Sequence, residues 1–137
     1  MPATALSLAA FIAWSLLLLV LMELLRTRLV LTGRIAANGF QPDNANLSPF
    51  LQRLARAHLN CVESLPVLGG LMLLALATGH AAVTDPLAPW LVIARVAQSS
   101  IHLASLSVNA VTLRFMAFAV QIIIGLWWVW RLLAALA

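Results

Sequence analysis

Polar residues recur at helical spacing within a largely apolar stretch of this chain, at Arg53, Arg56, Asn60 and Glu63. Successive residues of an α-helix are turned by about 100°, so these four positions share one face. Guanidinium groups recognise carboxylates through forked hydrogen bonds. Glu63 lies ten residues beyond Arg53, which is about 15 Å along a helix. This face therefore has the chemistry to bind an anionic ligand, and it extends into an apolar segment.

A second stripe of polar residues shares one helical face further along the chain, at Arg95, Gln98 and His102. Arg95 lies inside an apolar segment, where an unpaired charge is costly. Glu63 is the acidic residue expected at a similar depth, so we predict that it forms an ion pair with Arg95. Breaking that pair would cost several kcal/mol, about 3–5. Alternatively, the two stripes only hold their helices together, as polar contacts between membrane helices commonly do.

Several cations remain without acidic partners near one end of the expected helices, namely Arg53, Arg56 and Arg114. Such a cationic pocket is suited to bind an anionic ligand together with a second, apolar ligand. Arg114 is expected to open the last helix, where the helix dipole also favours an anion. The alternative for Arg114 is that its side chain extends to lipid headgroups.

The composition indicates that these residues lie in a membrane protein. The chain has 137 residues, of which 64% are hydrophobic and 9% are charged, and its mean hydropathy is +1.03. Soluble domains carry about 25% charged residues. All eight basic residues are arginines and form no continuous patch. The composition therefore excludes an ordinary soluble enzyme, a disordered chain and a nucleic-acid-binding module.

The apolar segments predict an all-α integral membrane four-helix bundle, with one domain over residues 1–137. The expected helices cover about 3–25, 49–78, 86–107 and 113–136, each long enough to cross a bilayer. Ser48 and Pro49 have the residue types of an N-cap and first helical position. Residues 109–112 are expected to form a tight connection. Arginines concentrate in the first loop and near the last connection, which predicts that both face the cytoplasm and that both termini lie outside.

The run Arg56-Ala57-His58-Leu59-Asn60-Cys61-Val62-Glu63-Ser64-Leu65-Pro66 resembles the signature of the MAPEG family, the membrane-associated proteins of eicosanoid and glutathione metabolism. Its pattern R-A-x-x-N-x-x-E-x-x-P matches at every specified position. The residues from Phe40 to Asp43 also look loosely like a family loop. The resemblance covers the whole chain and implies a homotrimer of four-helix protomers that binds glutathione between subunits at the cytoplasmic end.

The resemblance also implies roles for individual residues. The glutathione-binding residues would be Arg34, Arg53, Arg56, Asn60, Glu63, Arg95 and Gln98, with Arg34 reaching the glutathione of a neighbouring protomer. Arg114 would stabilise the thiolate, because a nearby cation lowers the pKa of a thiol. His102 falls where the family usually has a tyrosine and is the second candidate catalytic residue. The expected activity is a glutathione-dependent transferase or peroxidase acting on a lipophilic substrate that arrives through membrane lipid.

The chain also departs from the mammalian members of the family. It has no tyrosine, and Phe115 follows the expected catalytic arginine where prostaglandin E synthase has a serine. These departures favour a divergent bacterial branch located in the inner membrane. They also favour the alternative of a non-catalytic member that binds a lipid or a partner protein through the same pocket. A channel or transporter is a weaker alternative, because no broken helix is expected.

The other candidate residues have structural interpretations. Cys61 lies off the polar stripe and is expected to be a buried thiol. The three histidines are too far apart in sequence to suggest a metal site. We expect Glu23 to pair with Arg26 or Arg28, the Gly69-Gly70 pair to allow close helix packing, and the tryptophans at 127, 128 and 130 to anchor the membrane interface.

Overall fold

The computed structural model describes all residues from 1 to 137 and contains only helices, which confirms the all-α prediction. In chain order the elements are α1 (Ala3–Leu31), α2 (Pro49–Ser64), the π-helical segment η1 (Leu65–Gly69), α3 (Gly70–Ala77), α4 (Ala81–Thr84), α5 (Ala88–Ala104) and α6 (Val108–Leu136).

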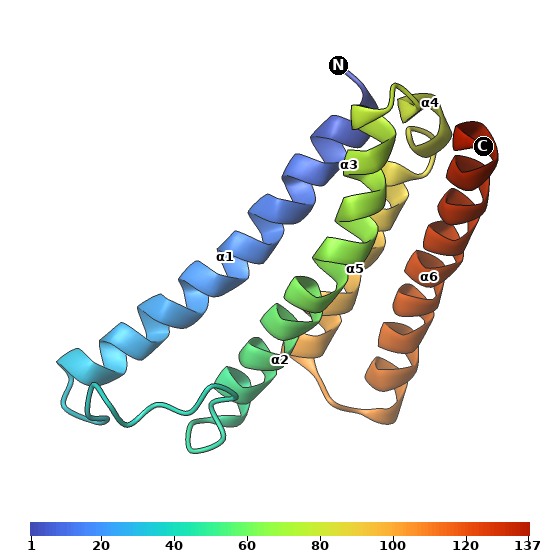
Figure 1. Ribbon diagram of the computed structural model, residues 1–137. Coiled ribbons are helices and arrows are strands. Elements are labelled where there is room, and N and C mark those ends of the chain that lie inside the picture. The colour runs from blue at the N-terminus through green and yellow to red at the C-terminus, as the bar shows by residue number, and fades with distance from the viewer.

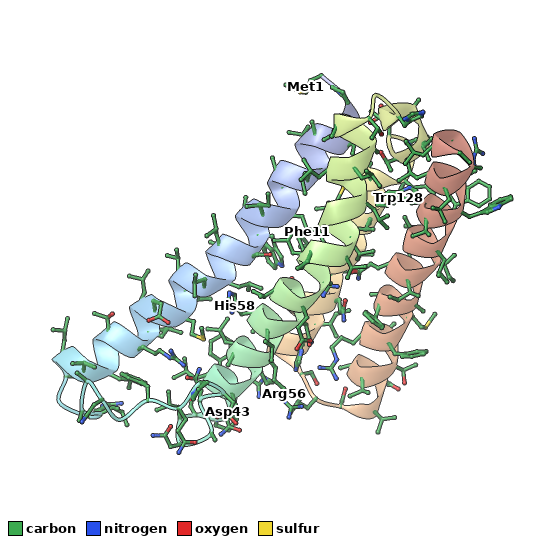
Figure 2. The ribbon with its side chains drawn as sticks, in the orientation of Figure 1. Met1, Phe11, Asp43, Arg56, His58 and Trp128 are labelled. Atoms are coloured by element: carbon green, nitrogen blue, oxygen red, sulfur yellow. The ribbon has the colours of Figure 1, made fainter.

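The long helices lie side by side, with α5 in contact with α1, α2 and α6. Both termini lie at one end, and the loop 32–48 and the α5–α6 connection lie at the other (Figure 1). This second end is called the loop end below. The core residues include Phe11, Leu54, Leu91 and Trp128, each fully buried. Phe11 and Trp128 are labelled among the helices in Figure 2. Trp128 is therefore a core residue, whereas Trp127 and Trp130 are exposed, so the interface interpretation is wrong for Trp128.

Three helices are long and apolar enough to cross a membrane: α1, the continuous helix Pro49–Ala77 and α6. The helix α5 has 17 residues and carries the polar stripe that includes Arg95. The chain is a membrane protein, and a four-span topology remains a prediction.

The helix α1 continues six residues beyond its expected end near Leu25, to Leu31. It ends in a Schellman motif, in which the Gly33 N–H donates to Val30 O and the Arg34 N–H donates to Leu29 O. Gly33 adopts a φ of 71°, a left-handed conformation that glycine takes without steric penalty. The arginines in the last two turns of α1 are compatible with helix, so the boundary is set by the glycine.

The helix that begins at Pro49 has the expected start. Ser48 Oγ accepts a hydrogen bond from the Leu51 N–H, and Pro49 is in the first turn. At Leu65 the helix widens into the π-helical segment η1, which contains Pro66. Proline has no N–H to donate, and its ring displaces the preceding turn, which accounts for the altered hydrogen bonding. Within η1, a Cβ on Gly69 would lie 3.2 Å from Leu8 Cδ1, so Gly69 permits close packing of α1.

The expected connection at residues 109–112 is wrong, because these residues lie inside α6. The connection instead comprises residues 105–107. Ser107 caps α6 by accepting a hydrogen bond from the Ala110 N–H at 3.2 Å. This cap places Arg114 near the end of the second turn of α6, so it does not open the helix.

At the end opposite the loop end, Asp85 caps the first turn of α1 from a distant part of the chain. Its Oδ1 accepts hydrogen bonds from the Thr4 hydroxyl at 2.6 Å and from the Thr4 N–H at 2.8 Å. These two bonds favour the carboxylate and lower the pKa of Asp85. The contact joins the start of α1 to the turn before α5.

Candidate functional site

Polar side chains of α2, α5 and α6 line three adjoining pockets, with volumes of about 410, 330 and 270 Å³. The largest, here called the inner pocket, shares Asn60 and Gln98 with the second, the middle pocket. The middle pocket shares Arg56, His102 and Arg114 with the third, the end pocket. Because neighbouring pockets share lining residues, we treat them as one polar groove that runs inward from the loop end.

The groove brings together eight of the nine predicted site residues. These are Arg53, Arg56, Asn60, Glu63, Arg95, Gln98, His102 and Arg114. The α2 residues share one face, as their spacing predicted. Arg53 is also tied to α5, because its Nε donates to Leu103 O at 3.1 Å, and its guanidinium lies 5.9 Å from the Phe50 ring centre. Figure 2 places Arg56 and Asp43 near the loop end.

Arg95 is almost fully buried, with 1% of its surface exposed. Its Nη1 contacts Asn60 O at 3.5 Å, and its guanidinium lies 5.7 Å from the Phe11 ring centre. Its Nε and Nη2 are buried without a hydrogen-bond partner. Because both nitrogens are donors, Arg95 retains capacity to bind an acceptor.

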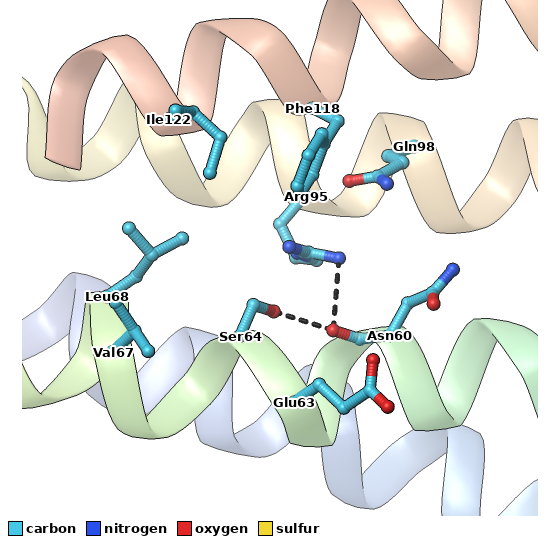
Figure 3. Close-up of a pocket in the computed structure, with 9 residues that line it drawn as sticks. All are labelled: Asn60, Glu63, Ser64, Val67, Leu68, Arg95, Gln98, Phe118 and Ile122. Carbon is cyan, nitrogen blue, oxygen red and sulfur yellow. Dashed lines mark hydrogen bonds between the residues drawn. The ribbon is translucent and has the colours of Figure 1, made fainter. Parts of the chain in front are cut away.

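The predicted ion pair between Glu63 and Arg95 is wrong for the single chain. The ion pair that the chain forms joins Arg26 to Glu23 at 3.3 Å, as expected for Glu23. Arg95 and Glu63 both line the inner pocket, but the Arg95 guanidinium points to the Asn60 carbonyl, and Glu63 is exposed (Figure 3). The helical pattern placed both residues on facing helices, but it could not predict that a backbone carbonyl would hold the guanidinium.

Gln121 is a groove-supporting residue that the sequence interpretation missed. It is fully buried in α6, and its Nε2 donates to Gln98 Oε1 at 2.9 Å and to Ala117 O at 3.0 Å. This bond orients the Gln98 amide with its oxygen toward Gln121, so that its NH₂ can donate toward the groove. An isolated glutamine in the apolar stretch between Arg114 and Arg131 was the signal for this contact.

His102 and Arg114 meet in the part of the groove nearest the loop end. His102 is buried, with 4% exposed, and both residues line the middle and end pockets with Arg56. Phe115 also lines the middle pocket. Cys61 is buried outside the groove lining, with its Sγ 3.4 Å from Ser99 Oγ, so the expectation of a buried thiol is confirmed.

Arg34 is the predicted site residue that the chain does not bring to the groove. It follows α1 and lines a separate pocket with Arg28, Thr32 and Phe50. A role for Arg34 at the same ligand would therefore require a second protomer.

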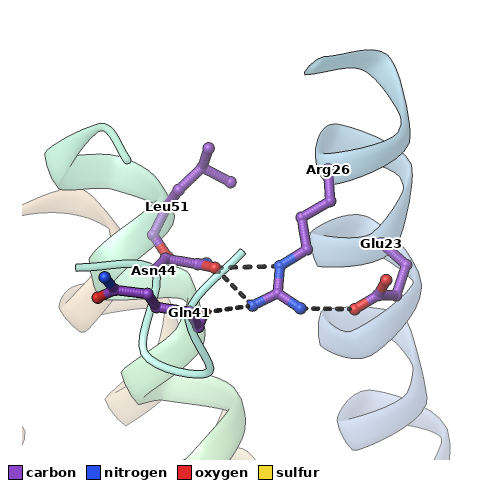
Figure 4. A network of polar contacts seen from close by, with 5 residues as sticks. All are labelled: Glu23, Arg26, Gln41, Asn44 and Leu51. Atoms are coloured by element: carbon purple, nitrogen blue, oxygen red, sulfur yellow. Dashed lines mark hydrogen bonds and ion pairs between the residues drawn. The ribbon is translucent and has the colours of Figure 1, made fainter. Parts of the chain in front are cut away.

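The first loop supplies a carboxylate to the groove and is fixed by a buried asparagine. Asp43 lines the end pocket. The next residue, Asn44, is fully buried and has a φ of 57°. Its Oδ1 accepts hydrogen bonds from Nε and Nη2 of Arg26, while its Nδ2 donates to Leu51 O at 2.8 Å. Figure 4 shows Arg26 also reaching Gln41 O and Glu23. Asparagine is among the residues that best tolerate a positive φ.

The groove combines surplus positive charge with an apolar wall. Arg53, Arg56 and Arg114 line its loop-end half together with one acidic residue, Asp43. The inner half is walled by Val67, Leu68, Phe118 and Ile122. This arrangement can bind an anion at the loop end and an apolar group deeper between the helices.

Comparison with known proteins gives one match. A family model described as the MAPEG family matches residues 4–134, nearly the whole chain. No curated protein and no solved structure matches the chain significantly.

Proposed function

Because this chain belongs to the MAPEG family of membrane proteins, we propose that it is a membrane-embedded glutathione-dependent transferase or peroxidase. The observation that carries the proposal is the polar groove, in which three arginines face a ligand-sized space beside an apolar wall. Glutathione has two carboxylates for the arginines. A lipophilic electrophile would reach the same groove from the bilayer.

In the proposed complex, Arg53 and Arg56 bind the carboxylates of glutathione, and Asn60 and Gln98 donate amide hydrogen bonds. Glu63 accepts the ammonium group of the peptide, and Arg95 offers its two unpartnered nitrogens to a ligand acceptor. Arg114 lies closest to the sulfur and stabilises the thiolate, as cations near a thiol do. The thiolate sulfur then attacks the electrophile. The apolar residues of the inner pocket exclude water from the reacting groups.

We further propose that the protein assembles as a homotrimer of four-span protomers in a bacterial inner membrane, with the groove on the cytoplasmic side. Arg34 lines a separate pocket in the single chain, and the assembly would give it the proposed role at the groove of a neighbouring protomer. The distribution of arginines supports the orientation: the loop end carries Arg26, Arg28 and Arg34. Mass measurement in detergent tests the trimer.

Glutathione binding with thiolate formation is the direct test of the proposed activity. The purified protein should bind glutathione at millimolar concentration or below, and the bound thiol should show the ultraviolet absorbance of a thiolate. Arg114→Ala should lose the thiolate signal while keeping much of the binding. The matched control is Arg131→Ala, which removes an arginine at the opposite end of α6. Absence of binding at millimolar glutathione would overturn the proposal.

A non-catalytic member that binds a lipid or a partner protein through the same groove is the second candidate. Two observations favour it: the chain has no tyrosine, and Phe115 brings an apolar ring to the middle pocket. This candidate predicts that an anionic lipid copurifies in the groove and that no test electrophile is turned over.

A further inference from the structure

The imidazole of His102 lies in the groove without a hydrogen-bond partner from the protein. It lies in the last turn of α5, and Nδ1 is buried without a hydrogen-bond partner. Nε2 is not among the fully buried atoms, and the ring lines both the middle and the end pocket. No protein group therefore competes with a ligand for this imidazole.

The charged groups around His102 come from each neighbouring element. Arg53 and Arg56 face it from α2, Arg114 faces it from α6, and Asp43 faces it from the first loop. Burial of the ring disfavours a positive charge on it, and so do three positive charges against one negative charge. In the empty groove the imidazole is consequently neutral, which is the form that accepts a proton.

A bound glutathione changes this balance. Its two carboxylates offset two of the guanidinium charges, and its thiolate adds a negative charge next to the ring. The charge part of the penalty on an imidazolium is thereby removed, and the adjacent thiolate forms an ion pair with it. Binding of the anionic ligand thus prepares His102 to take up a proton.

No other groove residue is as well suited to accept the proton of the thiol. The chain has neither tyrosine nor lysine, and arginine does not lose its proton in proteins. Asp43 lines only the end pocket, whereas His102 also lines the middle pocket, and Glu63 lines only the inner pocket, which Arg114 does not line. His58 and His80 line none of the three pockets.

We infer that His102 is the proton acceptor for the ligand thiol, an inference that rests on the proposed function. The S–H bond of the thiol breaks, the proton forms a bond to Nε2 of His102, and the electron pair stays on the sulfur. The sulfur then uses that pair to bond to the electrophile. The imidazolium returns the proton to the leaving group or to the anion formed by the addition, which restores the neutral ring.

Counting protons during binding tests this step. Calorimetry in two buffers with different protonation enthalpies gives the number of protons released per bound ligand, and ultraviolet absorbance gives the fraction of thiolate. Glutathione is compared with S-methylglutathione, which has the same carboxylates but no thiol. The wild type, His102→Gln and the matched control His80→Gln are measured in the same way.

In the wild type and in His80→Gln, glutathione should form thiolate yet release no more protons than S-methylglutathione, because His102 keeps the proton. In His102→Gln, any thiolate formed should be matched by an equal release of protons to the solvent. The inference is overturned if the wild type releases one proton per thiolate, if it binds glutathione without forming thiolate, or if His102→Gln forms thiolate without releasing protons. If neither ligand binds to any of the proteins, the proposed function itself fails.

Discussion

Asn44→Ala should destabilise the protein far more than a loop substitution normally does. The side chain makes three hydrogen bonds, two from the Arg26 guanidinium and one to Leu51 O, and it is fully buried. Hydrogen bonds to charged groups contribute about 1.5–3 kcal/mol and neutral ones about 1 kcal/mol. Because one oxygen accepts both guanidinium bonds, we count that pair once, as about 2 kcal/mol. The expected loss in the free energy of unfolding is therefore about 3 kcal/mol from these bonds, and alanine at a φ of 57° adds about 1 kcal/mol.

The assay is unfolding in mixed detergent micelles, followed by the helical circular dichroism signal. Asn46→Ala is the matched control, because Asn46 lies in the same loop and makes one exposed bond, to Gly39 O at 2.9 Å; its loss should stay below about 0.5 kcal/mol. A double-mutant cycle with Arg26→Ala should give a coupling of about 2 kcal/mol. Equal losses for Asn44→Ala and Asn46→Ala, or a coupling near zero, would refute the reasoning.

Three further substitutions test other contacts. Arg95→Met should leave the free energy of unfolding unchanged or raise it, because it removes a buried charge that has no acidic partner. The same substitution should weaken glutathione binding. A fall of about 3 kcal/mol in the free energy of unfolding would instead indicate an ion pair with Glu63. Asp85→Asn should lower the free energy of unfolding at neutral pH. The lowered pKa of Asp85 means that the folded protein is stabilised by the ionised carboxylate, so protonation at low pH removes this contribution. In a pH titration, the difference from wild type should therefore shrink below about pH 4. Gly69→Ala should lower the free energy of unfolding by about 1 kcal/mol, because the added Cβ would press on Leu8 and Leu65. Gly70→Ala has open space around its Cβ position and should raise the free energy of unfolding by about 0.5–1 kcal/mol in the same assay. Equal effects of the two substitutions would contradict the packing assigned to Gly69.

The helical periodicity of the sequence predicted which residues line the groove. Two polar stripes at helical spacing can be satisfied in an apolar environment only by facing each other, so Arg56, Asn60 and Gln98 came together as expected. The start of α2 at Pro49 was also predictable, since Ser48 and Pro49 are strong local signals.

The details that the sequence did not predict depend on single contacts between distant residues. The contact of Arg95 with the Asn60 carbonyl depends on how α2 and α5 are packed, which periodicity does not determine. The buried role of Asn44 depends on Arg26, 18 residues earlier. The start of α6 was misplaced because asparagine and threonine at 109 and 112 are weak helix formers, but the cap at Ser107 overrides that preference.

A structure of the protein with glutathione bound in a lipid bilayer would test the central claim most directly. The account predicts the peptide in the polar groove, with its carboxylates at the arginines of α2 and its sulfur beside Arg114 and His102. Glutathione bound elsewhere, or a lipid that occupies the groove and is not displaced by glutathione, would contradict it.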